Sequence, residues 1–107
     1  MKTQVTGQTL LVSTTAAASV FPQELSQKVA NFADYHLILD LTGTPAKEDV
    51  LAFHQLAKSF RKNKKSFVVV AGGVDYDSFP QTLAVVPTIQ EAHDVIEMEE
   101  IERDLGF

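Results

Sequence analysis

This sequence of 107 residues contains no cysteine and no tryptophan. Without cysteine, the chain can form neither a disulfide framework nor a thiolate site for zinc or an iron–sulfur cluster, and it has no thiol nucleophile. Long apolar runs are also missing, because no stretch approaches the roughly 18 apolar residues that a membrane span needs. The first residues lack the apolar run and the small-residue cleavage pattern of a signal peptide. We therefore expect a cytoplasmic protein without a membrane partner.

Basic residues are scarcer than acidic ones, with 9 lysines and arginines against 14 aspartates and glutamates and a net charge of -5. This balance argues against binding to nucleic acids or to anionic membranes. Basic residues gather at positions 58–65, whereas acidic residues crowd positions 91–104. For the basic cluster, we favour a helix end whose carbonyls attract cations over a phosphate or RNA site.

The length and the composition predict one domain over residues 1–107, because 45% of the residues are hydrophobic and 21% are charged. A chain of this size buries about 60 to 70% of the surface that it exposes when unfolded. That is enough for a core of two or three layers, but it leaves little room for a deep enclosed active site. We therefore expect a binding module with no catalytic residue, metal or cofactor.

The chain is organised around a predicted central strand at residues 35–41. Four of the five residues from Leu37 to Leu41 are large and aliphatic, which suits a strand covered on both faces. Asp40 lies near the carboxyl end of this strand. In α/β sheets, ligands and partners are usually received at that end.

Further strands are predicted before and after the central one. Residues 2–6 and 9–14 are expected to form a hairpin around Gly7. Residues 66–71 are apolar and follow a helical segment, so a parallel strand is expected there. Residues 83–86 are also apolar and follow a loop or a single helical turn, and a third parallel strand is expected there. The predicted fold class is α/β, with a mixed β-sheet, an N-terminal hairpin, parallel core strands and packed helices.

Three helices are predicted from apolar spacing and from signals at their ends. The first covers residues 22–33, and the second runs from about 46 to 62. The third opens with a Thr-x-x-Glu capping box formed by Thr88 and Glu91. Its apolar residues are expected to share one broad buried stripe: Ile89, Ala92, Val95, Ile96, Met98, Ile101 and Leu105.

Three motifs, in this order, resemble the STAS domain, the fold of anti-sigma-factor antagonists and of the cytoplasmic ends of sulfate transporters. Residues 37–43 are similar to the family's apolar-Asp-Leu-Ser/Thr-Gly signature, and residues 56–58 lie ahead of the strand at 67–70. Residues 86–92 are similar to the Pro-Thr-x-x-Glu-Ala that opens the family's last helix. The resemblance covers nearly the whole chain. It implies a non-catalytic regulatory or scaffolding module, monomeric or homodimeric, that binds a protein partner such as a regulatory kinase or an anti-sigma-like protein.

The chain departs from the family at the usual phosphorylation site. STAS switches carry a phosphoacceptor serine at the start of the helix after the signature strand, whereas this chain has Lys47, Glu48 and Asp49 there. Glu48 and Asp49 either present a permanent negative charge to the partner or complement the dipole of their own helix. The expected partner-binding surface joins this helix start to the preceding turn and comprises Thr42, Gly43, Thr44, Lys47, Glu48 and Asp49.

The acidic ending at residues 96–107 is also similar to a small bacterial STAS-like subgroup whose members sometimes carry the name ribonuclease Z. That activity needs a tight cluster of histidines and aspartates around two zinc ions. His36, His54 and His93 stand alone in the sequence, and each is better explained as a residue on a strand or helix face. We therefore expect no ribonuclease activity.

The alternative is a binder of a small ligand or phosphate, or an enzyme, at the carboxyl edge of the sheet. Asp40 would act there together with Gly72, Gly73 and Asp75. Asp40 also begins a sequence close to the Asp-Lys-Thr-Gly-Thr motif of P-type ATPases, but Leu41 replaces the lysine that helps aspartyl-phosphate chemistry. The two glycines are more often simply a turn that needs a positive φ than an anion site.

Overall fold

The computed structural model describes residues 2–14, 35–41, 47–80 and 82–106. The helix predicted over residues 22–33 lies outside the described residues. Within the described part of the chain, no helix is both long enough and apolar enough to cross a membrane.

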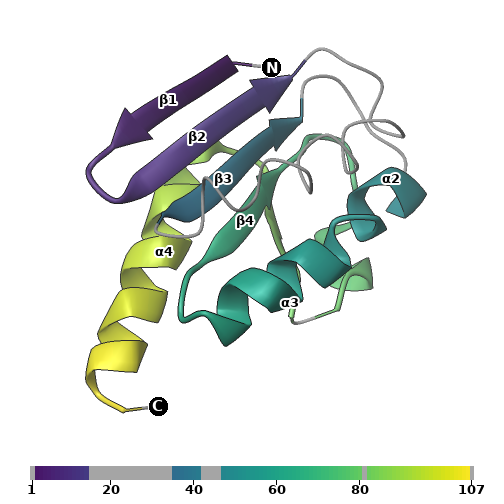
Figure 1. The fold of residues 1–107 in the computed structure, drawn as a ribbon. Helices are drawn as coiled ribbons and strands as arrows, with labels where there is room; N and C mark the ends of the chain where they lie inside the picture. Colours follow the sequence, from purple (N-terminus) through teal and green to yellow (C-terminus); the bar gives the residue numbers. More distant parts are fainter. Residues whose placement is uncertain (1, 15–34, 42–46, 81, 107) are drawn as a thin grey trace.

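Five strands of the described residues form one mixed sheet, and their order in the sheet follows their order in the sequence. The strands are β1 (Lys2–Thr6), β2 (Thr9–Thr14), β3 (His36–Leu41), β4 (Phe67–Val70) and β5 (Ala84–Val86). β1 pairs antiparallel with β2, whereas the other three neighbouring pairs are parallel (Figure 1). The predicted N-terminal hairpin, the parallel core and the α/β fold class are therefore confirmed.

β3 is covered on both faces, as its apolar sequence predicts. Successive side chains of a strand point to opposite faces of the sheet. Leu37 and Leu39 belong to the core on one face, and Ile38 belongs to the core on the other. The parallel register places Ile38 between Leu11 of β2 and Val68 of β4. The middle of the sheet is thus the boundary between two separate apolar cores.

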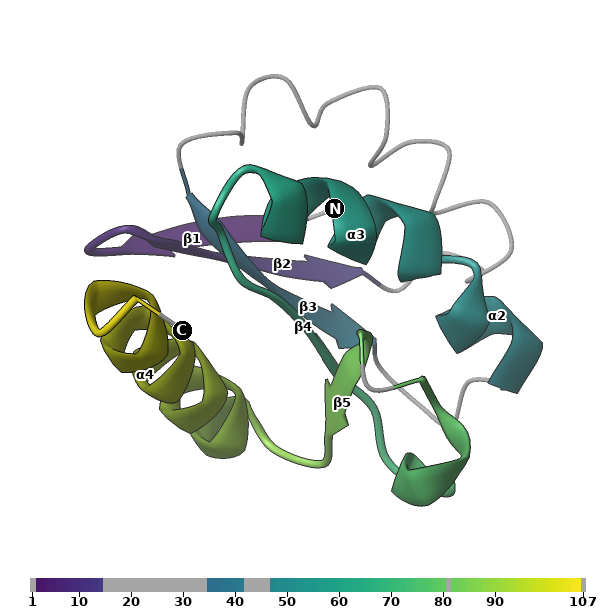
Figure 2. The same ribbon diagram turned by 90° about the horizontal axis from the view of Figure 1, so that it is seen from below.

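Helices cover both faces of the sheet (Figure 2). α2 (Lys47–Leu51) and α3 (His54–Lys62) lie on one side, and α4 (Ile89–Asp104) lies on the other. The larger core lies under α3, where the ring centroids of Phe60 and Phe67 are 5.3 Å apart. The buried residues of the smaller core, under α4, are Ile38, Val68, Val70, Ala92 and Ile96.

The continuous helix predicted over residues 46–62 was wrong, because a turn separates α2 from α3. The amide of Phe53 donates to the carbonyl of Val50, three residues back, which is the tighter spacing of a 3-10 turn. Residues three apart eclipse one another in such a turn. As a result, Val50 and Phe53 both reach the core under the sheet, and both are fully buried.

The single buried stripe predicted for α4 was also wrong. Ala92 and Ile96 are buried against the sheet, and Val95 is partly buried. The other large apolar residues of the predicted stripe are exposed: Ile89, Met98, Ile101 and Leu105. Because a helical turn takes about 3.6 residues, the step from Ile96 to Met98 carries the apolar pattern to the opposite side of the helix.

Capping side chains fix the starts of α4 and of a short 3-10 helix, η2 (Tyr76–Ser78). The hydroxyl of Thr88 accepts a hydrogen bond of 3.1 Å from the amide of Glu91, as the predicted N-cap requires. Asp75 Oδ1 accepts a bond of 3.2 Å from the amide of Asp77 in the same manner. Both helix starts are therefore determined by local sequence.

Candidate functional site

The partner-binding surface predicted from the family resemblance is described only in part. Residues 42–44 lie outside the described residues. Lys47 and Glu48 are exposed at the start of α2, and Asp49 belongs to the same five-residue helix. This surface therefore stays a prediction.

The alternative ligand site, at the carboxyl edge, is brought together in part. β3 and β4 are parallel neighbours, so Asp40 near the end of β3 and the glycine pair after β4 lie at the same edge of the sheet. Gly73 has a φ of 71°, in the left-handed region that glycine favours. The carboxylate of Asp75 caps η2. Gly73 and Asp75 are thus explained by the turn that they form, whereas a Cβ at Gly72 would meet no atom within 4 Å.

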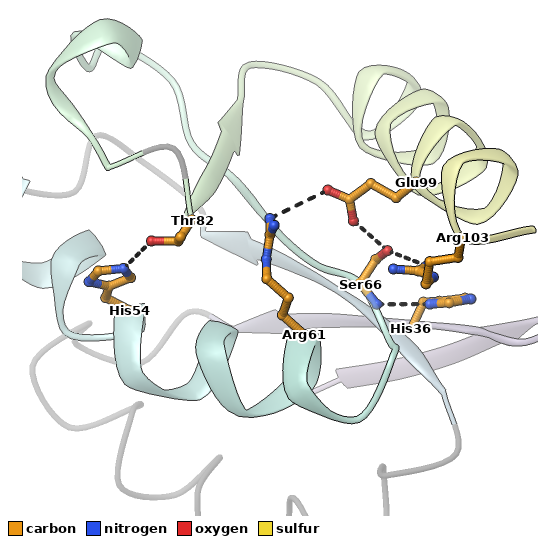
Figure 3. Close-up of polar contacts among 7 residues, drawn as sticks. All are labelled: His36, His54, Arg61, Ser66, Thr82, Glu99 and Arg103. Atoms are coloured by element: carbon orange, nitrogen blue, oxygen red, sulfur yellow. Dashed lines mark hydrogen bonds and ion pairs between the residues drawn. The ribbon is translucent and has the colours of Figure 1, made fainter. Parts of the chain in front are cut away.

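A cluster of polar side chains lies at the opposite, amino edge of the sheet, where the sequence led us to expect no site (Figure 3). His36 opens β3 and Ser66 directly precedes β4, so the parallel pairing of these strands places the two residues side by side. α4 begins after β5 and runs back across the sheet, and its last turns reach this edge (Figure 2). The amino-edge cluster comprises His36, Ser66, Glu99, Glu100 and Arg103.

His36 is only 3% exposed, and both of its ring nitrogens have partners. Nδ1 accepts a hydrogen bond of 2.9 Å from the backbone amide of Ser66 (Figure 3). An accepting Nδ1 carries no proton, so the neutral ring donates from Nε2 to Glu100 Oε1 at 2.6 Å. Burial lowers the pKa of His36 below its ordinary value of 6.5, against the opposing effect of Glu100, and the charges of Arg103 and Lys65 add to the lowering.

Ser66 connects α4 to the sheet through its side chain (Figure 3). Its hydroxyl donates to Glu99 Oε1 at 2.6 Å and accepts from Arg103 Nη2 at 2.9 Å. Glu99 Oε2 in turn lies 3.8 Å from Arg61 Nη2 of α3. A serine nucleophile needs a general base that is hydrogen-bonded to its hydroxyl. Here Nδ1 of His36 accepts from the backbone amide of Ser66 and not from its hydroxyl. The cluster therefore holds α4 on the sheet and does not form a Ser–His catalytic pair.

An open pocket of about 440 Å³ lies beside the amino-edge cluster, between the ends of α3 and α4. Its lining residues are Arg61, Lys64, Glu99, Glu102, Arg103 and Gly106. The basic cluster at residues 58–65 and the acidic end of α4 thus meet here, and charges of both signs line the pocket. Such a lining selects neither anions nor cations by charge alone.

The three histidines lie on three different elements. His36 opens β3, His54 opens α3 and His93 lies within α4. His54 Nε2 is 2.5 Å from the hydroxyl of Thr82 (Figure 3). Among the residues that the structure describes, no three histidine or acidic side chains are grouped so that they could hold a metal ion.

Known proteins add no family to these observations. No protein-family model matches this chain, and no curated protein matches it significantly.

α4 carries an exposed apolar surface, which the sequence pattern had assigned to the core. Met98, Ile101 and Leu105 are 62%, 53% and 67% exposed. At about 100° per residue, the three fall within roughly 60° of one another around the helix, on the side opposite Ala92 and Ile96. We call these three residues the outer stripe. The spacing of 3 and 4 residues could have identified it, but only once the side facing the sheet was known.

Exposed acidic side chains flank the outer stripe or precede it on the same side of α4. All of them are exposed, and they are Glu91, Asp94, Glu97, Glu102 and Asp104. Arg103 is the only lysine or arginine of α4, and its guanidinium is turned toward Ser66 at the sheet. The outer side of α4 is therefore apolar along its centre and acidic at its margins.

Proposed function

We propose that this chain is a non-catalytic, STAS-like regulatory or scaffolding module that binds a protein partner. The order of the three family-like motifs supports this proposal, as does the mixed α/β sheet that carries them. The apolar signature forms the central strand β3, and the Pro-Thr motif leads into the cap of α4 at Thr88. The proposal then needs a surface on which a partner can bind.

The outer stripe is the observation that carries this proposal. Met98 and Ile101 stand on the solvent side of α4, and Leu105 continues the stripe at the C-cap of this helix. Taking one such side chain fully out of water contributes about 1.5 to 3 kcal/mol. Contiguous apolar patches on an otherwise polar surface mark sites of interaction. A protein that covers α4 in a complex accounts for the placement of these three residues.

The amino-edge cluster supports a binding role over a catalytic one. The hydroxyl of Ser66 and both ring nitrogens of His36 are already bonded within the fold. A general acid or base must be able to reach a proton on the substrate, and these groups point at one another instead. Their contacts hold the last turns of α4 in a fixed orientation, and with them the outer stripe.

A quantitative capture experiment tests the proposal. The native chain and the double variant Met98→Gln/Leu105→Gln are immobilised and exposed to lysate of the source cell. Glutamine is a good helix former and both positions are exposed, so the fold should be unchanged, which circular dichroism checks. We expect a protein that the native chain retains and that the variant loses by at least about tenfold, the equivalent of one buried side chain. If the native chain retains nothing above background, the proposal fails.

Glu48→Lys is the matched variant for the surface predicted from the family resemblance. Glu48 is exposed on α2, so reversing its charge leaves the core untouched. A partner lost only from this variant would bind at the start of α2, and the outer stripe would then no longer carry the proposal. A partner lost only from the Met98→Gln/Leu105→Gln variant binds α4, as we expect.

A further inference from the structure

We infer that the partner presents a basic amphipathic helix to the outer stripe, an inference that rests on the proposed function. The stripe runs from Met98 to Leu105, which is about two turns and roughly 10 Å of helix at 1.5 Å per residue. Its residues recur at spacings of three and four, the pattern of a seam between two packed helices. A second helix can place its own apolar residues between those of the stripe.

The charges around the stripe determine which sign of charge the partner helix must carry. The exposed acids Glu97, Glu102 and Asp104 flank the outer stripe, and two more exposed acids precede it on the same side of the helix. The only arginine of α4, Arg103, is bound at the sheet. Charges at the margins of a helix pair decide which partners are accepted, because like charges facing each other are unfavourable. The fitting helix therefore carries lysines or arginines on both sides of its apolar seam.

The same charges argue against a second copy of this chain as the occupant. A symmetric pair would bring the same patch of each copy together, because an isologous interface contacts itself. The acids beside one stripe would then face the identical acids beside the other. The net charge of -5 adds to this repulsion between copies. A basic helix removes both costs and keeps the apolar contact.

Synthetic helical peptides test the inference directly. The first probe is a fluorescein-labelled peptide of about five turns, with leucines at seam spacing and lysines at both margins. The second is identical except that glutamates replace the lysines. Binding to the native chain is followed by fluorescence anisotropy at low and high salt. The variants are Ile101→Gln/Leu105→Gln, which removes apolar contact, and Glu97→Gln/Glu102→Gln, which removes charge and keeps size. Circular dichroism and the unfolding midpoint of each variant confirm that it is folded.

The expected result separates apolar contact from charge. The lysine peptide should bind the native chain, and each double variant should weaken its binding at least about tenfold. The glutamate peptide should not bind, and high salt should weaken the lysine peptide. Lysine-peptide binding that Ile101→Gln/Leu105→Gln leaves unchanged would overturn the inference, because charge alone would then explain it. Concentration-dependent dimers that the same variant abolishes would overturn it in favour of a second copy.

The two proposals fail in different ways. A natural partner that the capture experiment finds on α4, but that the lysine peptide does not displace, contradicts the basic helix and leaves the binding module standing. Capture of no partner at all contradicts the binding module itself.

Discussion

Acidification should destabilise this fold through His36. The folded ring is neutral, with Nδ1 accepting from the amide of Ser66. Because the pKa of His36 in the folded chain lies below 6.5, the unfolded chain binds this proton more readily. The stability that the neutral ring provides is therefore complete above about pH 6.5 and is lost progressively as the pH falls toward the folded pKa.

The size of the effect follows from the contacts. Protonation of Nδ1 leaves the buried amide of Ser66 without its acceptor, which costs about 1 to 3 kcal/mol. Attraction to Glu100 offsets only part of this cost, because the Glu100 side chain is 49% exposed and its charge is screened by water. One proton can change the free energy of unfolding by at most about 1.4 kcal/mol per pH unit.

Urea unfolding at constant ionic strength, from pH 8 to pH 5, measures this dependence. The reference is His36→Asn, whose amide oxygen can accept from Ser66 but does not titrate. We expect the native chain to lose stability relative to this variant as the pH falls below 6.5, because only the native chain takes up the proton. Native and variant curves that run parallel from pH 7 to pH 5 would refute the reasoning.

Glu100→Gln provides a second test, in which the pKa of His36 should shift in a known direction. The substitution keeps an oxygen for the Nε2 proton of His36 and removes the carboxylate charge that raises its pKa. The pKa of His36 should then fall further, so the loss of stability in acid should extend to lower pH than in the native chain. A smaller loss in this variant than in the native chain would show that another group takes up the proton.

Two helix ends give further predictions, both measured as the free energy of unfolding in urea. Lys64 follows α3 with a φ of 62°, a left-handed conformation that costs an L-residue about 1 to 2 kcal/mol, so Lys64→Gly should stabilise by up to about 1 kcal/mol. Lys58→Gly, at an exposed position inside α3, should instead destabilise by about 0.5 to 1 kcal/mol, and the same sign at both positions would contradict the left-handed conformation of Lys64. Thr88→Ala should cost about 1 kcal/mol by removing the acceptor for the amide of Glu91, and Thr88→Ser should restore most of it. If Thr88→Ser lost as much stability as Thr88→Ala, the methyl group of Thr88, and not its capping hydroxyl, would be the stabilising group.

The parallel strands β3, β4 and β5 were predictable because each contains a short apolar run. The stretch from Leu37 to Leu41 and the stretch from Phe67 to Val70 could only be buried on both faces, and parallel pairing follows from the helical connection between them. The cap at Thr88 was predictable for a similar reason, since its hydrogen bond is made within three residues.

The face of α4 that packs on the sheet was not predictable from spacing alone. Apolar residues occur all around this helix, so the pattern is compatible with more than one buried side. Packing against the sheet selects one of these sides, because Ala92 and Ile96 form a core with Ile38, Val68 and Val70. The remaining apolar residues then have no core to enter, which is why the predicted stripe divides into a buried part and an exposed part.

The amino-edge cluster escaped prediction because its members are distant in sequence. Ser66 lies 30 residues after His36, and Glu99 lies 33 residues after Ser66. The available signal was topological: parallel strands begin at the same edge, and a helix that returns across them ends there. That reasoning brings His36, Ser66 and the end of the last helix together, but it does not say which atoms are bonded.

The position of α4 after every strand has a consequence for how the chain is made. Synthesis runs from the N-terminus and proceeds at about 5 to 20 residues per second, so β1 to β5 leave the ribosome before this helix does. Until Ala92 and Ile96 emerge, Ile38, Val68 and Val70 have no helix to cover them and are exposed to solvent. During that interval the growing chain exposes apolar side chains of the kind that make folding intermediates prone to aggregation, and docking of Ala92 and Ile96 covers them.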